Sequence, residues 1–301
     1  MSHSSHTNSG SHTLVLNKDN IVADGKNSTL EYKFPTSVNF KNEQIAVAQL
    51  QMYYSWENIN SSPLNNNVFK YSFPEGASYV EYTITIPNGL YEISDINFYL
   101  QSQMIENSHY LVNSKGQNVY YLELKISPTD YSVVANMYSV PTALPTGFTN
   151  PASMPFSSGG LANATTKITI ESTNNFKDII GFQAGTYPAA TQTTNQTQKS
   201  SSFSPRLIPE VQPNRNVVIT CSGISNPYAN PQTKIYSIAP DVPIGGYIDY
   251  QPPEYLYNDL ADGYYNQLRI QFLDKDGVAL NILDPEITIL LTIRDKTQMN
   301  Y

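Results

Sequence analysis

The chain has 301 residues, a net charge of −8 and a charged fraction of 14%, against roughly 25% in an average soluble domain. A negative balance without any Lys/Arg cluster argues against specific nucleic-acid binding, which needs cations to neutralise phosphates. No stretch approaches the ~18 consecutive apolar residues of a membrane-spanning helix, so we expect no membrane span. The length is enough for one large β domain or two smaller ones.

Tyrosine and proline are abundant, with 23 and 20 copies. Protein–protein interfaces are enriched in aromatic side chains and depleted in Lys and Glu, so this composition favours a protein with large contact surfaces. Tyrosine also suits β-strands, and the same count is compatible with an ordinary β-rich fold.

The N-terminal residues 1–12 are polar Ser, His, Thr, Asn and Gly after the first Met. They offer too little apolar area to offset the entropy of ordering them, so we expect a flexible arm. They also lack the apolar core of a signal peptide, and we expect synthesis in the cytosol.

Period-two alternation of apolar and polar residues predicts the strands of the first half of the chain. The turn Pro87–Gly89 precedes a predicted helix from about Ser94 to Asn107, where Ser94 or Asp95 can cap the first turn. A helical stripe supports it, made of Ile96, Tyr99, Leu100, Met104 and Ile105. The predicted strands lie near 13–17, 28–34, 45–54, 67–73, 79–86, 119–126 and 131–138.

Two biased stretches interrupt this pattern, Pro141–Asn163 and Pro188–Pro213, both rich in Pro, Ser and Thr. Loops of this length are uncommon in compact domains unless they are functional or disordered, so they are candidates for partner contact. We expect a candidate insertion within about 141–213. Between the stretches lie a predicted strand at 165–172 and a helical turn at 176–182 that ends at Gly181.

The last segment predicts a half-buried strand at 286–294, with Ile287, Ile289, Leu291 and Ile293 on one face. Many short strands separated by Asn, Pro, Gly and Ser predict an all-β fold. We expect an antiparallel jelly-roll β-sandwich with one short helix and long loop insertions, although period alone does not separate a jelly roll from other sandwiches. Further strands are predicted at 216–222, 233–238, 246–250 and 265–273.

The sequence predicts no catalytic, cofactor-binding or metal-binding residue and no cofactor, so we expect a protein that is not an enzyme. Of the four histidines, His3, His6 and His12 lie in the polar arm, which cannot hold a preorganised site, and the fourth is His109. The one cysteine, Cys221, lies in a strand pattern and is expected in the core.

Two groups of carboxylates in the sequence are candidate sites. Asp274 and Asp276, with help from Asp284, could bind calcium, but Asp276-Gly277 between apolar strand patterns favours a hairpin turn.

A pair for glycoside hydrolysis could come from Glu254, Asp259 and Asp262, but their spacing carries no specificity. Solvated loop carboxylates are the favoured interpretation.

Four parts of the sequence carry a family resemblance: Pro87–Asn97, Phe176–Phe182 with Gly185–Pro188, Ser225–Tyr228 and Leu291–Asp295. Together they resemble the penton (vertex) capsid proteins of virophages and polinton-type elements. The resemblance implies a jelly-roll capsid domain at 13–301 that forms a homopentamer at each fivefold vertex of an icosahedral virion, assembled in the host cell cytoplasm. It also implies a double jelly-roll major capsid protein as partner, with minor capsid proteins as further candidates, and no catalytic residues.

Alternatives remain open at this stage. A minor capsid or cement protein would differ from a penton mainly in oligomer symmetry. A fibre-like carbohydrate- or receptor-binding β-sandwich would use exposed tyrosines and Trp56 to stack on sugar rings. A jelly-roll enzyme is a third alternative, but a cupin needs clustered strand histidines that the sequence lacks.

Overall fold

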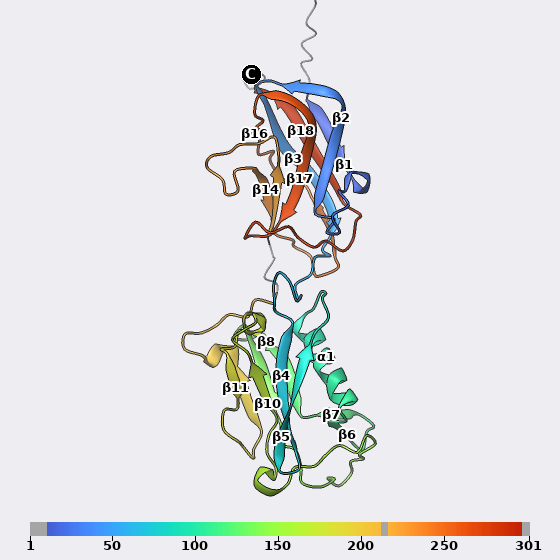
Figure 1. Cartoon of the computed structure of the whole chain (residues 1–301), viewed down its shortest axis with the longest axis vertical. Helices are drawn as coiled ribbons and strands as arrows, with labels where there is room; N and C mark the ends of the chain where they lie inside the picture. Colours follow the sequence, from blue (N-terminus) through green and yellow to red (C-terminus); the bar gives the residue numbers. More distant parts are fainter. Residues whose placement is uncertain (1–10, 212–215, 297–301) are drawn as a thin grey trace, which may run out of the picture. The chain divides into compact units, whose positions relative to one another are not determined.

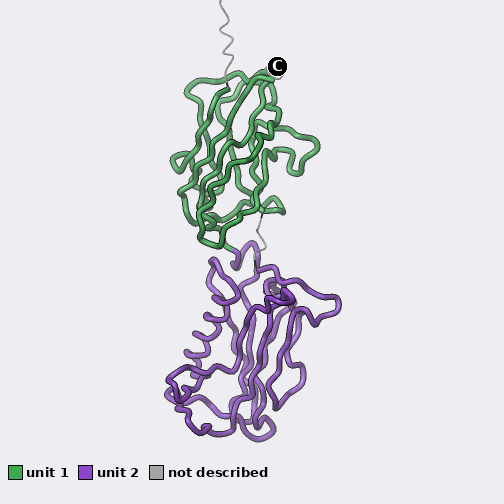
Figure 2. Tube along the Cα trace, turned by 180° about the vertical axis from the view of Figure 1, so that it is seen from behind, with its two compact units in different colours: residues 1–57, 214–301 green, residues 58–213 purple. Residues whose placement is uncertain are grey.

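The computed structural model describes residues 11–211 and 216–296. The chain divides into two compact units (Figure 2). Residues 1–57 and 214–301 form the first, here called the jelly-roll unit, and residues 58–213 form the second, here called the inserted unit. None of the helices within the described residues is long and apolar enough to span a membrane.

The jelly-roll unit contains eight strands of four or more residues among the described residues, plus the two-residue strand β16. They lie on both sides of the inserted segment in the sequence. Their bounds are β1 His12–Leu16, β2 Thr29–Phe40, β3 Glu43–Tyr53, β13 Val217–Cys221, β14 Lys234–Ile238, β15 Tyr247–Tyr250, β16 Asn258–Asp259, β17 Gly263–Leu273 and β18 Thr288–Asp295.

These strands form two antiparallel sheets, in the orders β1-β18-β3-β15 and β14-β13-β17-β2, with β16 pairing β3 (Figure 1). Numbered one to eight along this unit, the longer strands read 1-8-3-6 in one sheet and 2-7-4-5 in the other. This is the strand order of a jelly roll, so the expected fold class is confirmed. The first strand lies beside the last, with His12 opposite Ile293 and Leu16 opposite Ile289.

The inward faces of the two sheets make the core of this unit. In β18, Ile289, Leu291 and Ile293 are buried and the residues between them are only partly buried, as the period-two pattern predicts. Each such side chain contributes on the order of 1.5–3 kcal/mol when fully buried. The alternation of apolar and polar residues in β18 therefore accounts both for its place in the sheet and for which of its side chains are buried.

The inserted unit leaves the jelly roll after β3 and returns before β13. It has its own sheets, in the orders β11-β10-β4-β5 and β12-β9-β8, and a separate β6-β7 hairpin. Its elements are β4 Val68–Glu75, β5 Ser78–Thr85, α1 Ile93–Glu106, β6 Tyr110–Val112, β7 Asn118–Tyr120, β8 Leu122–Ser127, β9 Ser132–Met137, β10 Lys167–Ile170, α2 Phe176–Ile180, β11 Gly185–Tyr187 and β12 Gln196–Lys199.

The main helix α1 follows the predicted stripe closely. Ile96, Leu100 and Met104 are buried, whereas Ile105 is 41% exposed and lies off the stripe. The helix begins one residue earlier than expected, after Glu92, and Asp95 in its first turn accepts a hydrogen bond from the Glu92 N–H at 2.8 Å. The predicted helical turn is α2, which ends at Gly181 in the left-handed conformation with φ 68°.

The boundaries differ from the sequence expectation in three places. The inserted unit begins at Asn58, whereas the expected insertion began at about 141. β12 lies inside the stretch expected to be a loop, because its polar residues pair with β9 without any apolar alternation. Of the expected arm, residues 1–10 lie outside the described residues and His12 already belongs to β1.

Candidate functional site

Trp56, considered for sugar stacking, and Cys221, expected to be buried, are both in the core of the jelly-roll unit. Trp56 is 1% exposed and its ring lies 4.2 Å from that of Tyr54, so it is closed to a sugar ring. The sugar-stacking role considered for Trp56 is therefore wrong. Cys221 is buried as expected, and burial raises the pKa of its thiol to about 11.

The carboxylate of Asp274 organises a turn. It accepts hydrogen bonds from the N–H groups of Asp276 at 2.9 Å and Val278 at 2.8 Å, and Gly277 adopts φ 81°. Asp284 similarly accepts from the N–H of Glu286 at 2.8 Å. These contacts match the turn interpretation, because the carboxylates are engaged by backbone donors.

The three carboxylates considered for hydrolysis have separate surroundings. Asp259 pairs with Lys296 at 2.8 Å and accepts from Gln44 at 3.0 Å, while Asp262 accepts from the Asn42 N–H at 2.9 Å. Glu254 is exposed. Within residues 11–211 and 216–296, no cluster of three or more His, Cys, Asp or Glu side chains is arranged to hold a metal ion.

His109 is a buried polar residue that the sequence analysis left without a role. Its ring is stacked on Phe73 with a centroid distance of 3.9 Å and an interplanar angle of 1°. Its Nδ1 lies 3.0 Å from the Tyr71 hydroxyl and its Nε2 lies 3.2 Å from Glu75 Oε1. Burial lowers the pKa of His109 to about 4, although the nearby Glu75 carboxylate opposes this shift.

The hydrogen bonds around His109 define one arrangement of protons. Asn107 Nδ2 donates to the Tyr71 hydroxyl at 3.2 Å, so the Tyr71 proton is directed to His109 Nδ1. His109 Nε2–H then donates to Glu75, which also accepts from the Tyr82 hydroxyl. The neutral imidazole is thus satisfied at both nitrogens. The network joins β4, β5 and the end of α1.

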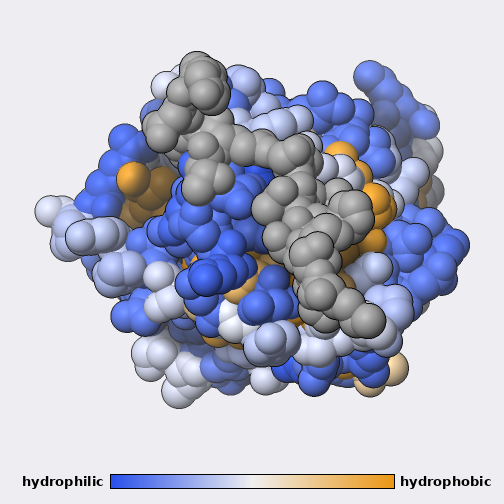
Figure 3. Space-filling view, turned by 90° about the horizontal axis from the view of Figure 1, so that it is seen from above, coloured by the Kyte–Doolittle hydropathy of each residue, from blue (hydrophilic) through white to orange (hydrophobic). Residues whose placement is uncertain are grey.

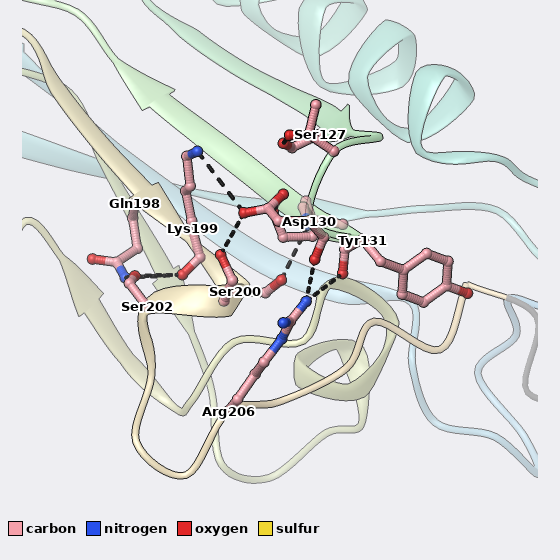
Figure 4. A network of polar contacts seen from close by, with 12 residues as sticks. Ser127, Asp130, Tyr131, Gln198, Lys199, Ser200, Ser202 and Arg206 are labelled. Carbon is pink, nitrogen blue, oxygen red and sulfur yellow. Dashed lines mark hydrogen bonds and ion pairs between the residues drawn. The ribbon is translucent and has the colours of Figure 1, made fainter.

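Asp130 is the centre of a second polar network, in the turn between β8 and β9 (Figure 4). Its carboxylate accepts hydrogen bonds from the Ser132 hydroxyl at 2.7 Å and the Ser201 hydroxyl at 2.8 Å, and Lys199 Nζ lies 3.9 Å away. Hydrogen bonds from the Ser127, Ser132 and Ser201 hydroxyls hold the pKa of Asp130 well below its usual range.

Arg206 also belongs to this network, and it lies in the same segment of the chain as Lys199 and Ser201. Its Nη2 donates to the carbonyl oxygen of Asp130 and, at 3.3 Å, to that of Tyr131 (Figure 4). The segment 199–206 is thereby fastened to the β8–β9 turn by side chains. Because the Asp130 carboxylate and carbonyl groups are engaged by side chains of the protein itself, we interpret the network as structural.

The jelly-roll unit has a pocket of about 290 Å³ on its surface, lined by residues 224–228 and 257–259. Asp259 lies in the lining, and its pairing with Lys296 holds the pKa of the carboxyl below its usual range. The guanidinium of Arg294 lies 3.4 Å from the centre of the Tyr257 ring. Tyr228, also in the lining, is 98% exposed.

Exposed aromatic residues occur elsewhere on the jelly-roll unit. The face of the chain seen in Figure 3 is mostly hydrophilic, with small hydrophobic patches. Tyr53 of β3 and Tyr247 of β15 form an edge-to-face pair at 5.1 Å, on the edge of their sheet. Tyr264, on β17 of the other sheet, is 78% exposed. The two sheets therefore carry different aromatic patches.

Comparison with known proteins finds similarity among solved structures. No family model matches the chain, and no curated protein matches it. Among solved structures, the chain is similar to the crystal structure of the selenomethionine-labelled mavirus penton protein, with a TM-score of 0.41 and 9% sequence identity. The match covers 94% of this chain and 98% of that chain.

Proposed function

We propose that this chain is a structural capsid protein that forms the pentameric vertex, or penton, of an icosahedral virus-like particle. The observation that carries the proposal is the strand order of the jelly-roll unit, in two sheets that each have four of the longer strands, with a whole second unit inserted between β3 and β13. Jelly rolls of this order serve viral capsids, lectins and cupins.

The sequence favours the capsid among these uses. The segments that resemble penton proteins fall on defined features of the fold: Pro87–Asn97 leads from β5 into α1, Phe176–Phe182 contains α2, and Leu291–Asp295 ends β18. A charge-poor, tyrosine-rich chain suits a subunit with several neighbours. The two histidines in the described residues, His12 and His109, lie in different units, which does not favour a cupin site.

A fivefold ring is heterologous, so each subunit must present two different and complementary patches. The exposed pair Tyr53 and Tyr247 at the β15 edge supplies one aromatic patch, and Tyr264 on β17 supplies another. We assign these two patches to the two sides of the ring contact. The partner at the vertex would be a double jelly-roll major capsid protein.

The first test is the mass of the purified protein by native mass spectrometry over a range of concentrations, with and without the corresponding major capsid protein. The proposal expects a pentamer, either alone or induced by the partner. A trimer would favour a minor capsid or cement protein. A strict monomer under both conditions would contradict the vertex role.

A second test separates the two patches. Tyr53→Ser with Tyr247→Ser should abolish the ring, and so should Tyr264→Ser, because each removes one side of every contact. In a mixture of the two variants, the intact patch of one variant can bind the intact patch of the other. Both remaining patches of this pair are mutated, so the mixture should form heterodimers and nothing larger. Tyr131→Ser, which changes an exposed tyrosine of the inserted unit, is the control.

A further inference from the structure

The pocket on the jelly-roll unit has the composition of a small-molecule site. Its lining comes from two segments, 224–228 after β13 and 257–259 at β16. Its volume of about 290 Å³ is close to the lower limit of ligand pockets, roughly 300 Å³. A site of this size accepts one ring of a ligand with part of a second.

The lining offers both hydrogen-bond donors and acceptors. Asn258 Nδ2 donates to the carbonyl oxygens of Ile235 at 3.1 Å and Leu256 at 3.0 Å. The side-chain oxygen of Asn258, Oδ1, is then the atom left to accept a hydrogen bond from a ligand. Asn226 Oδ1 accepts from the Tyr228 N–H at 3.0 Å, which leaves the Asn226 amide N–H groups as donors. Within the described residues, neither free group has a hydrogen-bond partner.

Asp259 adds a fixed, charged acceptor. Lys296 Nζ at 2.8 Å and Gln44 Nε2 at 3.0 Å hold its carboxylate in place, and each oxygen keeps a further lone pair for a ligand hydroxyl. The charge of Asp259 is balanced by Lys296, so the site attracts neither an anion nor a lone cation strongly. A neutral ligand rich in hydroxyl groups fits this balance.

Tyr228 supplies a flat apolar surface beside these polar groups. Its backbone is fixed by the Asn226 side chain, and the Ala229 N–H also donates to the Asn226 carbonyl oxygen at 3.2 Å. The Tyr228 side chain is 98% exposed, so its ring is open to a ligand. Aromatic rings beside planar polar side chains bind the C–H face of a pyranose while its hydroxyls are hydrogen-bonded.

We propose that the pocket formed by residues 224–228 and 257–259 binds a neutral pyranose, such as a terminal sugar of a glycan, with Tyr228 stacking on the ring and Asn226, Asn258 and Asp259 binding its hydroxyls. This binding role is separate from assembly. For a ligand of about a dozen non-hydrogen atoms in an open site, a dissociation constant on the order of 1 mM is expected.

The test is saturation-transfer NMR with the full chain and the methyl glycosides of glucose, galactose, mannose and N-acetylglucosamine, followed by titration. At least one glycoside should receive saturation at its ring protons. Tyr228→Ala should weaken its binding about tenfold, the size of one aromatic contact, whereas Tyr228→Phe keeps the ring and should bind within about threefold of the parent. Tyr131→Ala is the control and should bind as the parent does.

Several outcomes would overturn the proposal: no saturation of any glycoside, or saturation that persists unchanged in Tyr228→Ala. If no sugar binds and Tyr228→Ala instead reduces assembly with the major capsid protein, the pocket is a protein contact and the sugar site is refuted while the vertex role stands. Sugar binding by a strictly monomeric protein would support the sugar site and contradict the vertex role.

Discussion

His109 is the residue at which a single proton changes the hydrogen bonding of the inserted unit. In the neutral form, Nδ1 accepts from Tyr71 and Nε2–H donates to Glu75. A proton on Nδ1 would face the Tyr71 hydroxyl, which already accepts from Asn107 and would have to redirect its own proton. Protonation therefore reverses the bond between His109 and Tyr71, which leaves the Tyr71 proton without this acceptor, and places a charge among the rings of Phe73 and Tyr82.

This arrangement predicts acid sensitivity of the inserted unit. The unfolded chain binds a proton at His109 near pH 6.5, whereas burial lowers the folded pKa to about 4. Between these values the unfolded state holds more protons, so stability is unaffected above about pH 7 and falls as the pH drops from 6.5 to 4. The loss amounts to roughly 3 kcal/mol at pH 4.

Urea unfolding between pH 7.5 and 4 measures this effect. The one tryptophan, Trp56, reports on the jelly-roll unit, so a circular dichroism transition without a Trp56 fluorescence change belongs to the inserted unit. His109→Gln keeps one acceptor and one donor without titrating, and should flatten the pH dependence. His12→Gln, at an exposed histidine of the other unit, should not. Equal slopes in the parent and His109→Gln would contradict the prediction.

Asp130 carries a second prediction at the residue scale. Its carboxylate accepts from Ser132 and Ser201, and this fastens the segment 199–206. Asp130→Asn replaces one acceptor oxygen with a donor, so we expect faster trypsin cleavage after Lys199 or Arg206, with little change in the midpoint of thermal unfolding. Asp276→Asn makes the same charge change at an exposed site and is the control. Unchanged cleavage rates would show that the network does not hold the segment.

At the scale of elements, the end of α2 depends on Gly181. Its φ is 68°, and a Cβ there would lie 2.9 Å from Pro209 N and 3.0 Å from Pro209 Cδ. Gly181→Ala should therefore add a clash to the cost of a left-handed Ala, which is itself about 1–2 kcal/mol. We expect a total loss of roughly 2–4 kcal/mol in unfolding free energy, measured by urea titration.

Gly147→Ala separates the two contributions. Gly147 has φ 81° but nothing lies within 4 Å of a Cβ built there, so its substitution carries only the conformational cost. We expect a loss of about 1 kcal/mol at this site. A Gly181→Ala variant no less stable than Gly147→Ala would show that the Pro209 contact relaxes freely.

The elements that could be predicted from the sequence are those whose burial pattern is strong. The alternation in β18 and the stripe of α1 each identify the element, because one face is apolar and the other is not. β12 was missed because Gln196–Lys199 has no apolar face, and it is held by pairing with β9. Short strands such as β6 and β11 have three residues each and carry too little pattern.

The sites were harder to predict than the strands, because their members are distant in sequence. His109 meets Glu75 across 34 positions and Asp130 meets Ser201 across 71. No local spacing marks such pairs, so only the fold brings them together. For Trp56 the sequence suggested a site that does not exist. A tryptophan can stack on a sugar ring at the surface, but this one is buried and packs against Tyr54.

For the whole molecule, the insertion between β3 and β13 raises the question of which part folds alone. The buried residues form two separate clusters, one from the strands of the jelly-roll unit and one from residues 59–182. A cluster of this kind, with its own sheets and helix, is what an independent domain requires. The jelly-roll unit, by contrast, needs strands from both sides of the insertion.

We therefore predict that residues 58–211 expressed alone fold cooperatively. Their core includes Phe69 stacked on Phe176 at 4.5 Å, which joins β4 to α2 across the unit. The expected result is a single unfolding transition in calorimetry, with the acid sensitivity of His109 retained. Phe69→Ala should destabilise this fragment by about 3–5 kcal/mol, the usual cost of removing a buried phenylalanine. A fragment without a cooperative transition would mean that the inserted unit depends on the jelly roll for its fold, despite its separate core.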